Sequence, residues 1–195
     1  PAAPAGVNGY GANDSVAINS SAAETLPKTG FAPGEVTELP EQPLNNIYTS
    51  LGDLWLEIPS LDLNTSLTGI PQIGTSWDIQ WLWDQAGYLK GTSYPGLPGN
   101  TGITAHVYLP NGLPGPFVNL HTLKWGEEVI LHANGQRYIY QIRETRKVWP
   151  NDLSVLKHED FDWITLITCQ GYNEKENSYD FRTVVRAVLI DVQPE

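Results

Sequence analysis

The stretch "DWITLITCQGYNEKENSYDFRTVVRAVLIDV", residues 162–192, decides the fold. It begins with a short apolar run that ends at Cys169, continues through polar residues, and closes with a second apolar run near Arg182. Short apolar runs bounded by polar and turn-forming residues are typical of buried strands. We therefore expect two strands here, with Cys169 at the end of the first and Arg182 at the head of the last.

Similar strand patterns precede this stretch. "LWLEIPSLDLNTSL" (54–67) alternates apolar and polar residues around Pro59, which predicts two short strands. "TGITAHVYL" (101–109) and "EEVILHA" (127–133) predict one strand each. "NGQ" predicts a hairpin turn into the long "RYIYQIRETRKVW", in which Tyr138, Tyr140 and Ile142 share one face.

The number of predicted strands indicates the fold class. About eight short strands with little helix favour a mainly β fold, a closed or nearly closed eight-stranded β-barrel with short helices, over residues 47–195. One short helix is expected from Ser76 to Trp83, with Ile79 and Leu82 packed inward together with the tryptophans. A length of 195 residues and a hydrophobic fraction of 41% are enough for one such core.

Residues 1–46 have a different composition. Pro, Ala, Gly, Asn, Ser and Glu dominate, and because large apolar side chains are few we expect an extended or disordered leader. Within it stands the pentapeptide Leu26, Pro27, Lys28, Thr29, Gly30. An extended chain from Gly30 to Leu54 would reach about 80 Å, so this pentapeptide can contact its own domain or a neighbouring molecule.

The charge and the cysteine count exclude several classes of protein. Eleven basic residues against 22 acidic ones give a net charge of -11, which argues against a nucleic acid or an anionic membrane as partner. The single Cys169 cannot form an internal disulfide. No apolar run approaches the roughly 20 residues of a membrane span, and we expect that a signal or anchor has been removed ahead of Pro1.

Three residues at predicted strand ends could carry chemistry together. They are Cys169, His106 after "GITA", and Arg182, and strand ends at one rim of a barrel can converge on a substrate. Thiolate acyl transfer needs this set: a nucleophile, a group that protonates the leaving amine, and a fixed cation for the oxyanion. Arg186, four residues beyond Arg182 on the same face, is the weaker candidate for the cation.

Three separated blocks of the chain resemble the sortase family of bacterial cysteine transpeptidases. They are "TLITCQGYNEKENSYDFR" (165–182), "GITAHVY" (102–108) and "LWLEIPSLDL" (54–63). The resemblance implies a sortase-type barrel in which Cys169 is the nucleophile, His106 the general acid and base, and Arg182 the oxyanion or substrate clamp. It requires no cofactor.

The resemblance also implies a substrate-binding region. Thr168 matches a position that contacts the bound motif, and Ala105 is given a minor packing role beside it. Trp149, Leu153 and Leu156 are expected to supply an apolar wall for a substrate Leu-Pro.

The remaining histidines and a cluster of carboxylates are not assigned to the site. His121, His132 and His158 are interpreted as solvated, and the carboxylates Glu159, Asp160 and Asp162 as a solvated loop rather than a calcium site. No metal site is predicted.

Under this resemblance the leader pentapeptide matches the Leu-Pro-any-Thr-Gly motif that sortases cut between Thr and Gly. The chain would then transfer the acyl group, through a thioester, to an amine of the cell wall or of another surface protein. A hydrolytic protease and an inactive module that binds such tails are the alternatives. The leader pentapeptide could be a self-substrate, an occupant that blocks the active site in cis or in trans, or a linker sequence without a function. The resemblance also implies a location at the outer face of the cytoplasmic membrane or at the cell surface.

Overall fold

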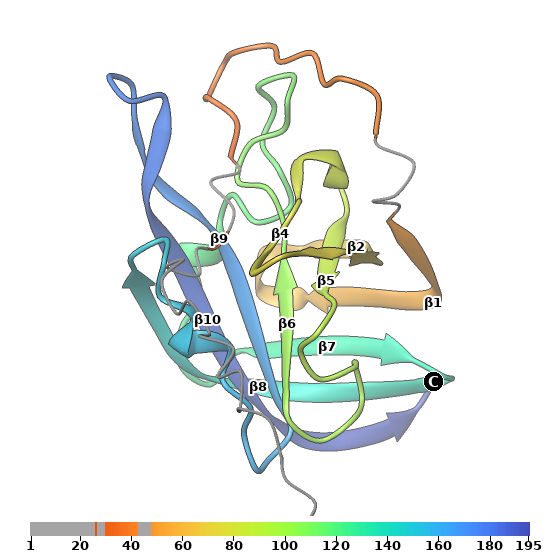
Figure 1. Ribbon diagram of the computed structural model, residues 1–195. Coiled ribbons are helices and arrows are strands. Elements are labelled where there is room, and N and C mark those ends of the chain that lie inside the picture. The colour runs from red at the N-terminus through yellow and green to blue at the C-terminus, as the bar shows by residue number, and fades with distance from the viewer. Residues whose placement is uncertain (1–25, 27–29, 43–47) are drawn as a thin grey trace, which may run out of the picture.

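The computed structural model describes Leu26, residues 30–42 and residues 48–195. Its strands form a closed barrel in the order β1-β2-β5-β6-β9-β10-β8-β7, which confirms the predicted mainly β class (Figure 1). A short two-stranded sheet, β3-β4, lies outside the barrel order. The strands are β1 (Thr49–Ile58), β2 (Leu63–Ile70), β3 (Gln72–Ile73), β4 (Ser76–Trp77), β5 (Ala86–Leu89), β6 (Asn100–Thr104), β7 (Glu128–Ala133), β8 (Gln136–Val148), β9 (Trp163–Asn173) and β10 (Ser178–Pro194).

The helical segments in the described part of the chain are short 3-10 turns, and none of them is long enough to cross a bilayer. The turns are η1 (Pro59–Leu61), η2 (Gln80–Leu82), η3 (Leu120–Thr122) and η4 (Leu153–Leu156). The break at Pro59 therefore separates two strands, as predicted. The "NGQ" turn is also confirmed, because Asn134 and Gly135 both adopt positive φ, the backbone that a two-residue hairpin favours.

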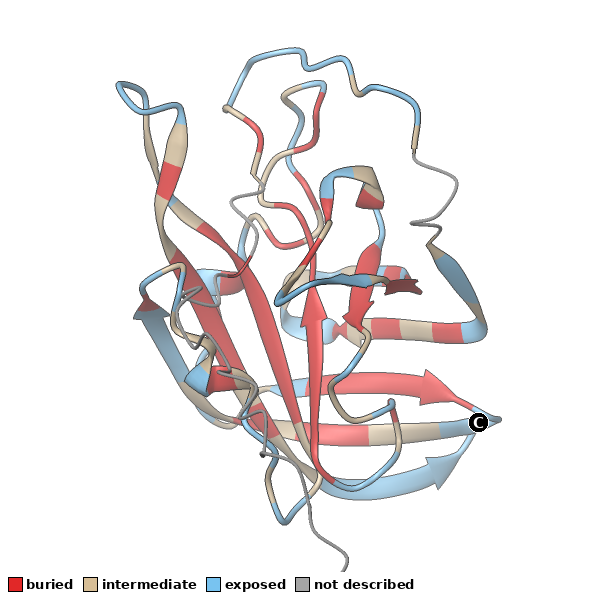
Figure 2. Ribbon diagram, viewed as in Figure 1, coloured by how far each residue is buried: buried red, intermediate tan, exposed pale blue. Residues whose placement is uncertain are grey.

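Buried residues gather on β5, β6 and the middle of β9 and β10, whereas the start of β1 and the end of β10 are exposed (Figure 2). Its main core cluster includes Leu56, Ile103, Tyr140 and Leu166, contributed by four different strands. A second cluster contains Ile79, Leu89 and Ile167 and also takes in Leu26 from the leader. The second cluster is thus the point where the barrel and the leader share a core.

Two pairings of β9 place the residues that matter for chemistry. β6 runs parallel to β9, with Thr104 opposite Ile167, and β9 runs antiparallel to β10, with Cys169 opposite Arg182. The Thr104 and Ile167 pair is separated by 63 residues, and so are His106 and Cys169. The chain after β6 therefore arrives level with the cysteine.

The helix predicted over Ser76–Trp83 is wrong. Ser76 and Trp77 form β4, where the indole of Trp77 donates to the Lys90 carbonyl over 2.8 Å, and only residues 80–82 turn. The Asp78 carboxylate accepts from the Gln80 amide, which starts the turn, and Trp83 at φ 52° ends it. Ile79 and Leu82 are nevertheless buried, as expected.

The boundaries around Cys169 and Arg182 also differ from the prediction. β9 continues past Cys169 to Asn173, and β10 begins at Ser178, four residues before Arg182. The polar loop expected between them is mostly a projecting hairpin (Figure 1), in which Tyr172 and Tyr179 pair across the strands with ring centroids 5.2 Å apart. The aromatic pair stabilises strand structure where the polar composition indicated a loop.

Candidate active site

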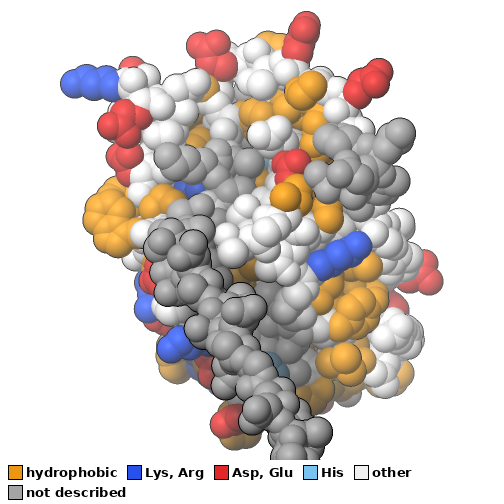
Figure 3. All heavy atoms as spheres, viewed as in Figure 1, with side chains coloured by type: hydrophobic (Ala, Val, Ile, Leu, Met, Phe, Trp, Pro, Cys, Tyr) orange, Lys and Arg blue, Asp and Glu red, His pale blue; other side chains and the backbone are white. Residues whose placement is uncertain are grey.

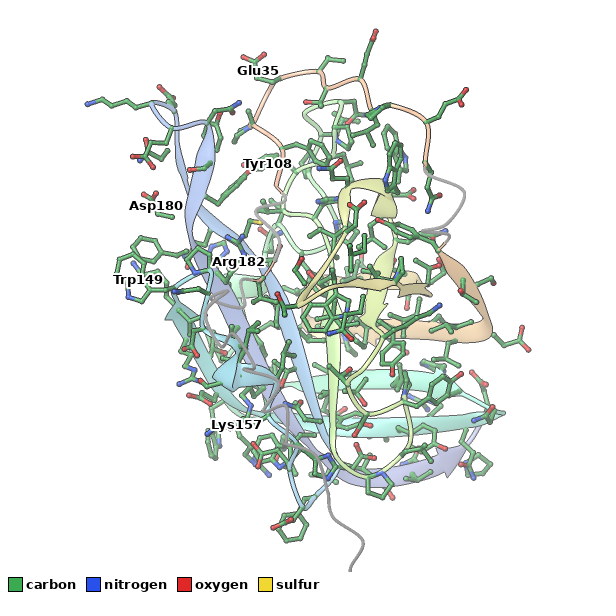
Figure 4. The ribbon with its side chains drawn as sticks, viewed as in Figure 1. Glu35, Tyr108, Trp149, Lys157, Asp180 and Arg182 are labelled. Atoms are coloured by element: carbon green, nitrogen blue, oxygen red, sulfur yellow. The ribbon has the colours of Figure 1, made fainter. Side chains whose placement is uncertain are left out.

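Cys169 and Arg182 are cross-strand neighbours on β9 and β10. Both are buried, at 4% and 2% exposure, and Arg182 donates to the Phe181 carbonyl over 2.9 Å. Burial raises the pKa of the Cys169 thiol to about 11, while the Arg182 charge acts in the opposite direction. Figure 4 labels Arg182 on β10, below the projecting hairpin. The strand pairing thus fixes a cation beside a thiol in a site shielded from water.

His106 completes the group that the sequence predicted. Two side-chain hydrogen bonds join the end of β6, just before His106, to β9. Thr104 donates to the Ile167 carbonyl over 2.8 Å, and Thr168 donates to the Ala105 carbonyl over 2.7 Å. The imidazole is 1% exposed, and neither ring nitrogen has a hydrogen-bond partner among the described residues. Burial lowers the pKa of His106 to about 4, against smaller opposing interactions with the main chain of Ile79 and Gln80, which do not reach hydrogen-bond geometry.

An apolar pocket opens beside Cys169, and Leu26 of the leader forms one of its walls. Leu26 is 4% exposed there, and its amide donates to the Pro150 carbonyl over 3.0 Å. The pocket is lined by Leu26, Ile79, Leu89, Thr104, Ile167, Thr168, Cys169 and Arg182. A branched apolar side chain is therefore the kind of group that this pocket accepts.

Gly30, the last residue of the pentapeptide, lies against the cysteine. A methyl group built on its Cα would lie 3.0 Å from Cys169 Sγ and would overlap the ring of Tyr179. Because that bond is about 1.5 Å long, the Gly30 Cα itself lies within about 4.5 Å of the sulfur. The site therefore accepts glycine at this position and excludes any larger residue without a shift of Tyr179.

Phe31 covers the histidine. Its ring centroid lies 4.8 Å from that of His106 at an interplanar angle of 58°, and its side chain is buried at 8% exposure. The hydroxyl of Tyr179 donates to the Phe31 carbonyl. The leader thus contributes to the burial that keeps the imidazole neutral.

The chain beyond Phe31 follows the loop after β6, near Tyr108 and Glu35 in Figure 4. The Thr37 amide donates to the Pro110 carbonyl. Gly112, at φ 80°, packs so closely on Gly34 that a methyl group on Gly112 would lie 2.9 Å from the Gly34 Cα. The leader is therefore held on both sides of Cys169.

A second hollow lies on the other side of the cysteine, at the base of the projecting hairpin. Pro33 of the leader lies at its edge. Its other walls come from β9, β10 and the loop after β6, namely Val107, Tyr108, Val118, His121, Thr168, Cys169, Gln170, Gly171, Tyr172, Tyr179 and Thr183. It gives a small molecule a second route to Cys169.

The residues predicted to bind substrate lie in different places. Thr168 lines the pocket, whereas Ala105 takes part through its carbonyl. Leu153 and Leu156 pack against the second core cluster, which includes Leu26. Trp149 is 64% exposed and does not line the pocket, because its ring packs at a tilt of 41° against that of Phe181.

Sequence reasoning missed much of the pocket and the contacts that hold the leader. The missed residues are Ile79, Leu89, Ile167, Phe31 and Tyr179. Ile79 was expected only to pack inward on a helix, and Leu89 and Ile167 carry the ordinary apolar signal of strands. Pro27, Lys28 and Thr29, the other predicted residues of the self-motif, lie outside the described residues.

Arg186 has other partners. It pairs with Glu159 and with Glu144, and its guanidinium lies 4.7 Å from the Trp163 ring centroid. This supports its interpretation as a structural charge.

The other histidines divide into two kinds. His121 and His158 are exposed, but His132 is buried at 3% exposure, so its interpretation as a solvated residue is wrong.

No group of three His, Cys, Asp or Glu residues in the described part of the chain is arranged to hold a metal ion. Figure 3 shows a face with acidic side chains around its edge and few basic ones.

The comparison with known families decides the identity of this arrangement. Residues 56–190 match the sortase domain, which is more than half of the chain. The chain belongs to the sortase family. Cys169, His106 and Arg182 all lie within the matched region of this sortase.

Individual relatives agree with this assignment. Sortase A of Staphylococcus aureus is 32% identical over 96 residues, which cover 47% of this chain and 45% of that protein. The match therefore spans somewhat less than half the length of that curated relative. A lid mutant of sortase A from Corynebacterium diphtheriae is 26% identical with a TM-score of 0.59, covering 72% of this chain and 71% of the other. Sortase C-1 of Streptococcus pneumoniae is 29% identical with a TM-score of 0.57, covering 70% and 66%.

Proposed function

We propose that this sortase is a cysteine transpeptidase that cuts Leu-Pro-any-Thr-Gly motifs between Thr and Gly and transfers the acyl group to an amine. One observation carries the proposal: the first and last residues of the chain's own motif flank the reactive cysteine. Leu26 is buried in the wall of the apolar pocket beside Cys169, and Gly30 lies beside Cys169 Sγ. A bound substrate with the same motif would present its scissile bond to the same sulfur.

The three polar residues divide the chemistry among them. Cys169 passes its thiol proton to His106 and Sγ attacks the Thr carbonyl, while Arg182, the paired neighbour on β10, stabilises the oxyanion or clamps the peptide. His106 gives a proton to the leaving Gly amine, which frees the first product and leaves a thioester. An incoming amine then attacks the thioester, and His106 takes up its proton.

The protonation of Cys169 and His106 depends on the leader. With Gly30 and Phe31 in place, burial disfavours both the thiolate and the imidazolium, so the resting pair is uncharged. A leader that leaves the cleft would let water reach Cys169 and His106. The thiol pKa would then fall under the influence of Arg182.

Leader and substrate compete for one cleft. Leu26 packs with Ile79, Leu89 and Ile167, so a substrate leucine can take this place only when Leu26 has left it, and Thr168 lies on the wall of the adjoining pocket. Leu153 and Leu156 support this pocket from behind, through the second core cluster. The leader therefore acts in cis as an occupant that a sorting signal must displace, and as a substrate when Cys169 attacks it.

The acceptor amine is assigned to the second hollow. This hollow reaches Cys169 from the side of Tyr108 and Tyr179, away from the Leu26 pocket. An amino group of the cell wall or of another surface protein is the expected acceptor, and the substrate is a sorting signal at the cell surface. Water that used the same route would make the protein a hydrolytic protease instead.

Intact mass spectrometry of the full chain with a free biotinylated Leu-Pro-Lys-Thr-Gly-Gly peptide and triglycine tests the proposal. We expect biotinyl-Leu-Pro-Lys-Thr joined to triglycine with wild type and none with Cys169→Ala. Hydrolysed peptide alone would identify a protease, and no turnover together with tight peptide binding would identify a binding module. Either result contradicts transpeptidation.

A further inference from the structure

The leader is held by contacts that do not depend on the pentapeptide. The Phe31 ring lies on His106, and its carbonyl accepts a hydrogen bond from Tyr179. The Thr37 amide donates to the Pro110 carbonyl. All of these contacts lie on the C-terminal side of Gly30. A cut on the N-terminal side of Gly30 would therefore leave them intact.

Such a cut changes the chemistry of Gly30. Its amide nitrogen becomes an amino group at the new N-terminus of residues 30–195, close to Cys169 Sγ. An α-amino group has a pKa of about 8, so a useful fraction is unprotonated near neutral pH. The site already excludes a side chain at this position, because a methyl group on Gly30 would overlap the Tyr179 ring. An unhindered glycine amine held near the cysteine is what acyl transfer needs in an acceptor.

We propose that this sortase is its own acceptor: after the leader is cut, the amino group of Gly30 attacks the thioester of an incoming sorting signal. The inference rests on the proposed function, because it needs the thioester. It adds a second activity, the joining of a foreign Leu-Pro-any-Thr segment to the enzyme's own N-terminus.

The steps balance with water as the one further reagent, because water releases residues 1–29 from the first thioester and frees Cys169. The Cys169 thiol then passes its proton to His106, Sγ attacks the Thr carbonyl carbon of the incoming peptide, the C–N bond to its Gly breaks, and His106 gives that proton to the leaving amine. The Gly30 nitrogen then attacks the same carbonyl carbon, the C–S bond breaks, and the amine proton passes to His106. This transfer exchanges one amide bond for another. Residues 1–29 are replaced by the incoming segment.

Tethering favours this acceptor over free amines. A group on a short tether acts at roughly millimolar effective concentration, and the contacts of Phe31 and Thr37 restrict it further. The joined product is again a leader with the motif in the cleft, so it can be cut again. The enzyme would therefore hold its captured substrate reversibly until a stronger or more abundant amine removes it.

The test uses the full chain with the biotinylated Leu-Pro-Lys-Thr-Gly-Gly peptide, without and with triglycine, followed by intact mass and peptide mapping. We expect biotinyl-Leu-Pro-Lys-Thr on the Gly30 nitrogen of residues 30–195, in a yield that does not change on tenfold dilution of the enzyme. Excess triglycine should remove the label as a biotinylated tetrapeptide conjugate.

Two variants sharpen the result. Phe31→Ala should lower the labelled fraction of cut chains about tenfold, because it removes a buried side chain that orients Gly30. Val36→Ala is the matched control on the same segment, and because Val36 is 77% exposed we expect wild-type labelling. Equal labelling in Phe31→Ala and wild type would overturn the proposed positioning.

The failures are distinguishable. If triglycine is labelled but residues 30–195 are not, self-acceptance is overturned and the proposed function stands. The same holds if triglycine is labelled while the enzyme chain still carries residues 1–29. A labelled yield that falls with dilution shows transfer between molecules and also overturns it. Absence of every labelled product, including the thioester, overturns the proposed function and the inference together.

Discussion

Two buried histidines of this barrel have opposite surroundings. His132 lies between Glu57 and Glu195, with ring nitrogens 3.0 and 2.7 Å from carboxylate oxygens, and stacks on Trp55 with centroids 3.3 Å apart. His106 is equally buried, yet its ring nitrogens have no hydrogen-bond partner among the described residues. Its ring faces Phe31 of the leader.

The difference separates a structural histidine from one available for proton transfer. Both ring nitrogens of His132 are hydrogen-bonded, one to Glu195 and one to Glu57, so neither is available to a substrate. At His106 neither nitrogen makes a well-formed hydrogen bond to a described residue, so both nitrogens can exchange protons. This fits the proton transfer proposed beside Cys169.

The largest expected effect is on turnover. His106→Asn should lower the rate of transfer to triglycine by about 10³-fold, since it removes the general acid and base. His132→Asn should stay within about threefold of wild type, because its partners lie on the barrel strands and the C-terminus. Initial rates measured by mass spectrometry check this, with thermal unfolding to establish that both variants are folded. Comparable losses in the two variants would remove the distinction.

The barrel itself could be predicted from local patterns. Apolar alternation and the Pro59 and Asn134 turns mark strands within a few residues, and these signals survive in the structure. The prediction that His106 and Cys169 follow neighbouring strand ends agrees with the pairing of Thr104 and Ile167, which has the same offset of 63 residues. Local pattern failed at residues 76–83, where Trp77 lies in a strand and donates to the Lys90 carbonyl, and where the positive φ of Trp83 ends the turn after one round.

The surroundings of the site could not be predicted in the same way. The partners of His132 lie 75 and 63 residues away in sequence, so nothing near it indicated burial. The composition of the leader predicted no buried side chain, yet Leu26 is buried in one core cluster with Ile79 and Ile167. Long-range pairing creates these environments, and composition does not encode them.

The second prediction concerns pH. Burial lowers the pKa of His106 to about 4 from the ordinary value near 6.5, so the folded protein resists protonation that the unfolded chain accepts. The resulting stability is complete above pH 6.5 and is lost as the pH falls through about 4, by up to about 3 kcal/mol. Urea unfolding of wild type and His106→Asn at pH 7 and pH 4 isolates this term. We expect the variant to lose less stability on acidification, and equal losses would contradict the prediction.

The smallest expected effect tests the other histidine. Glu57→Gln keeps the shape of the side chain at His132 but replaces a carboxylate 3.0 Å from the ring with a neutral amide. Because Glu57 is partly exposed, we expect a loss of only about 1 kcal/mol in the free energy of unfolding, with turnover unchanged. The matched control is Glu128→Gln on β7, an exposed carboxylate on the same strand as His132, for which no loss is expected. A loss of turnover in Glu57→Gln without a loss of stability would mean that His132 serves the active site, and the contrast between the two histidines would have to be abandoned.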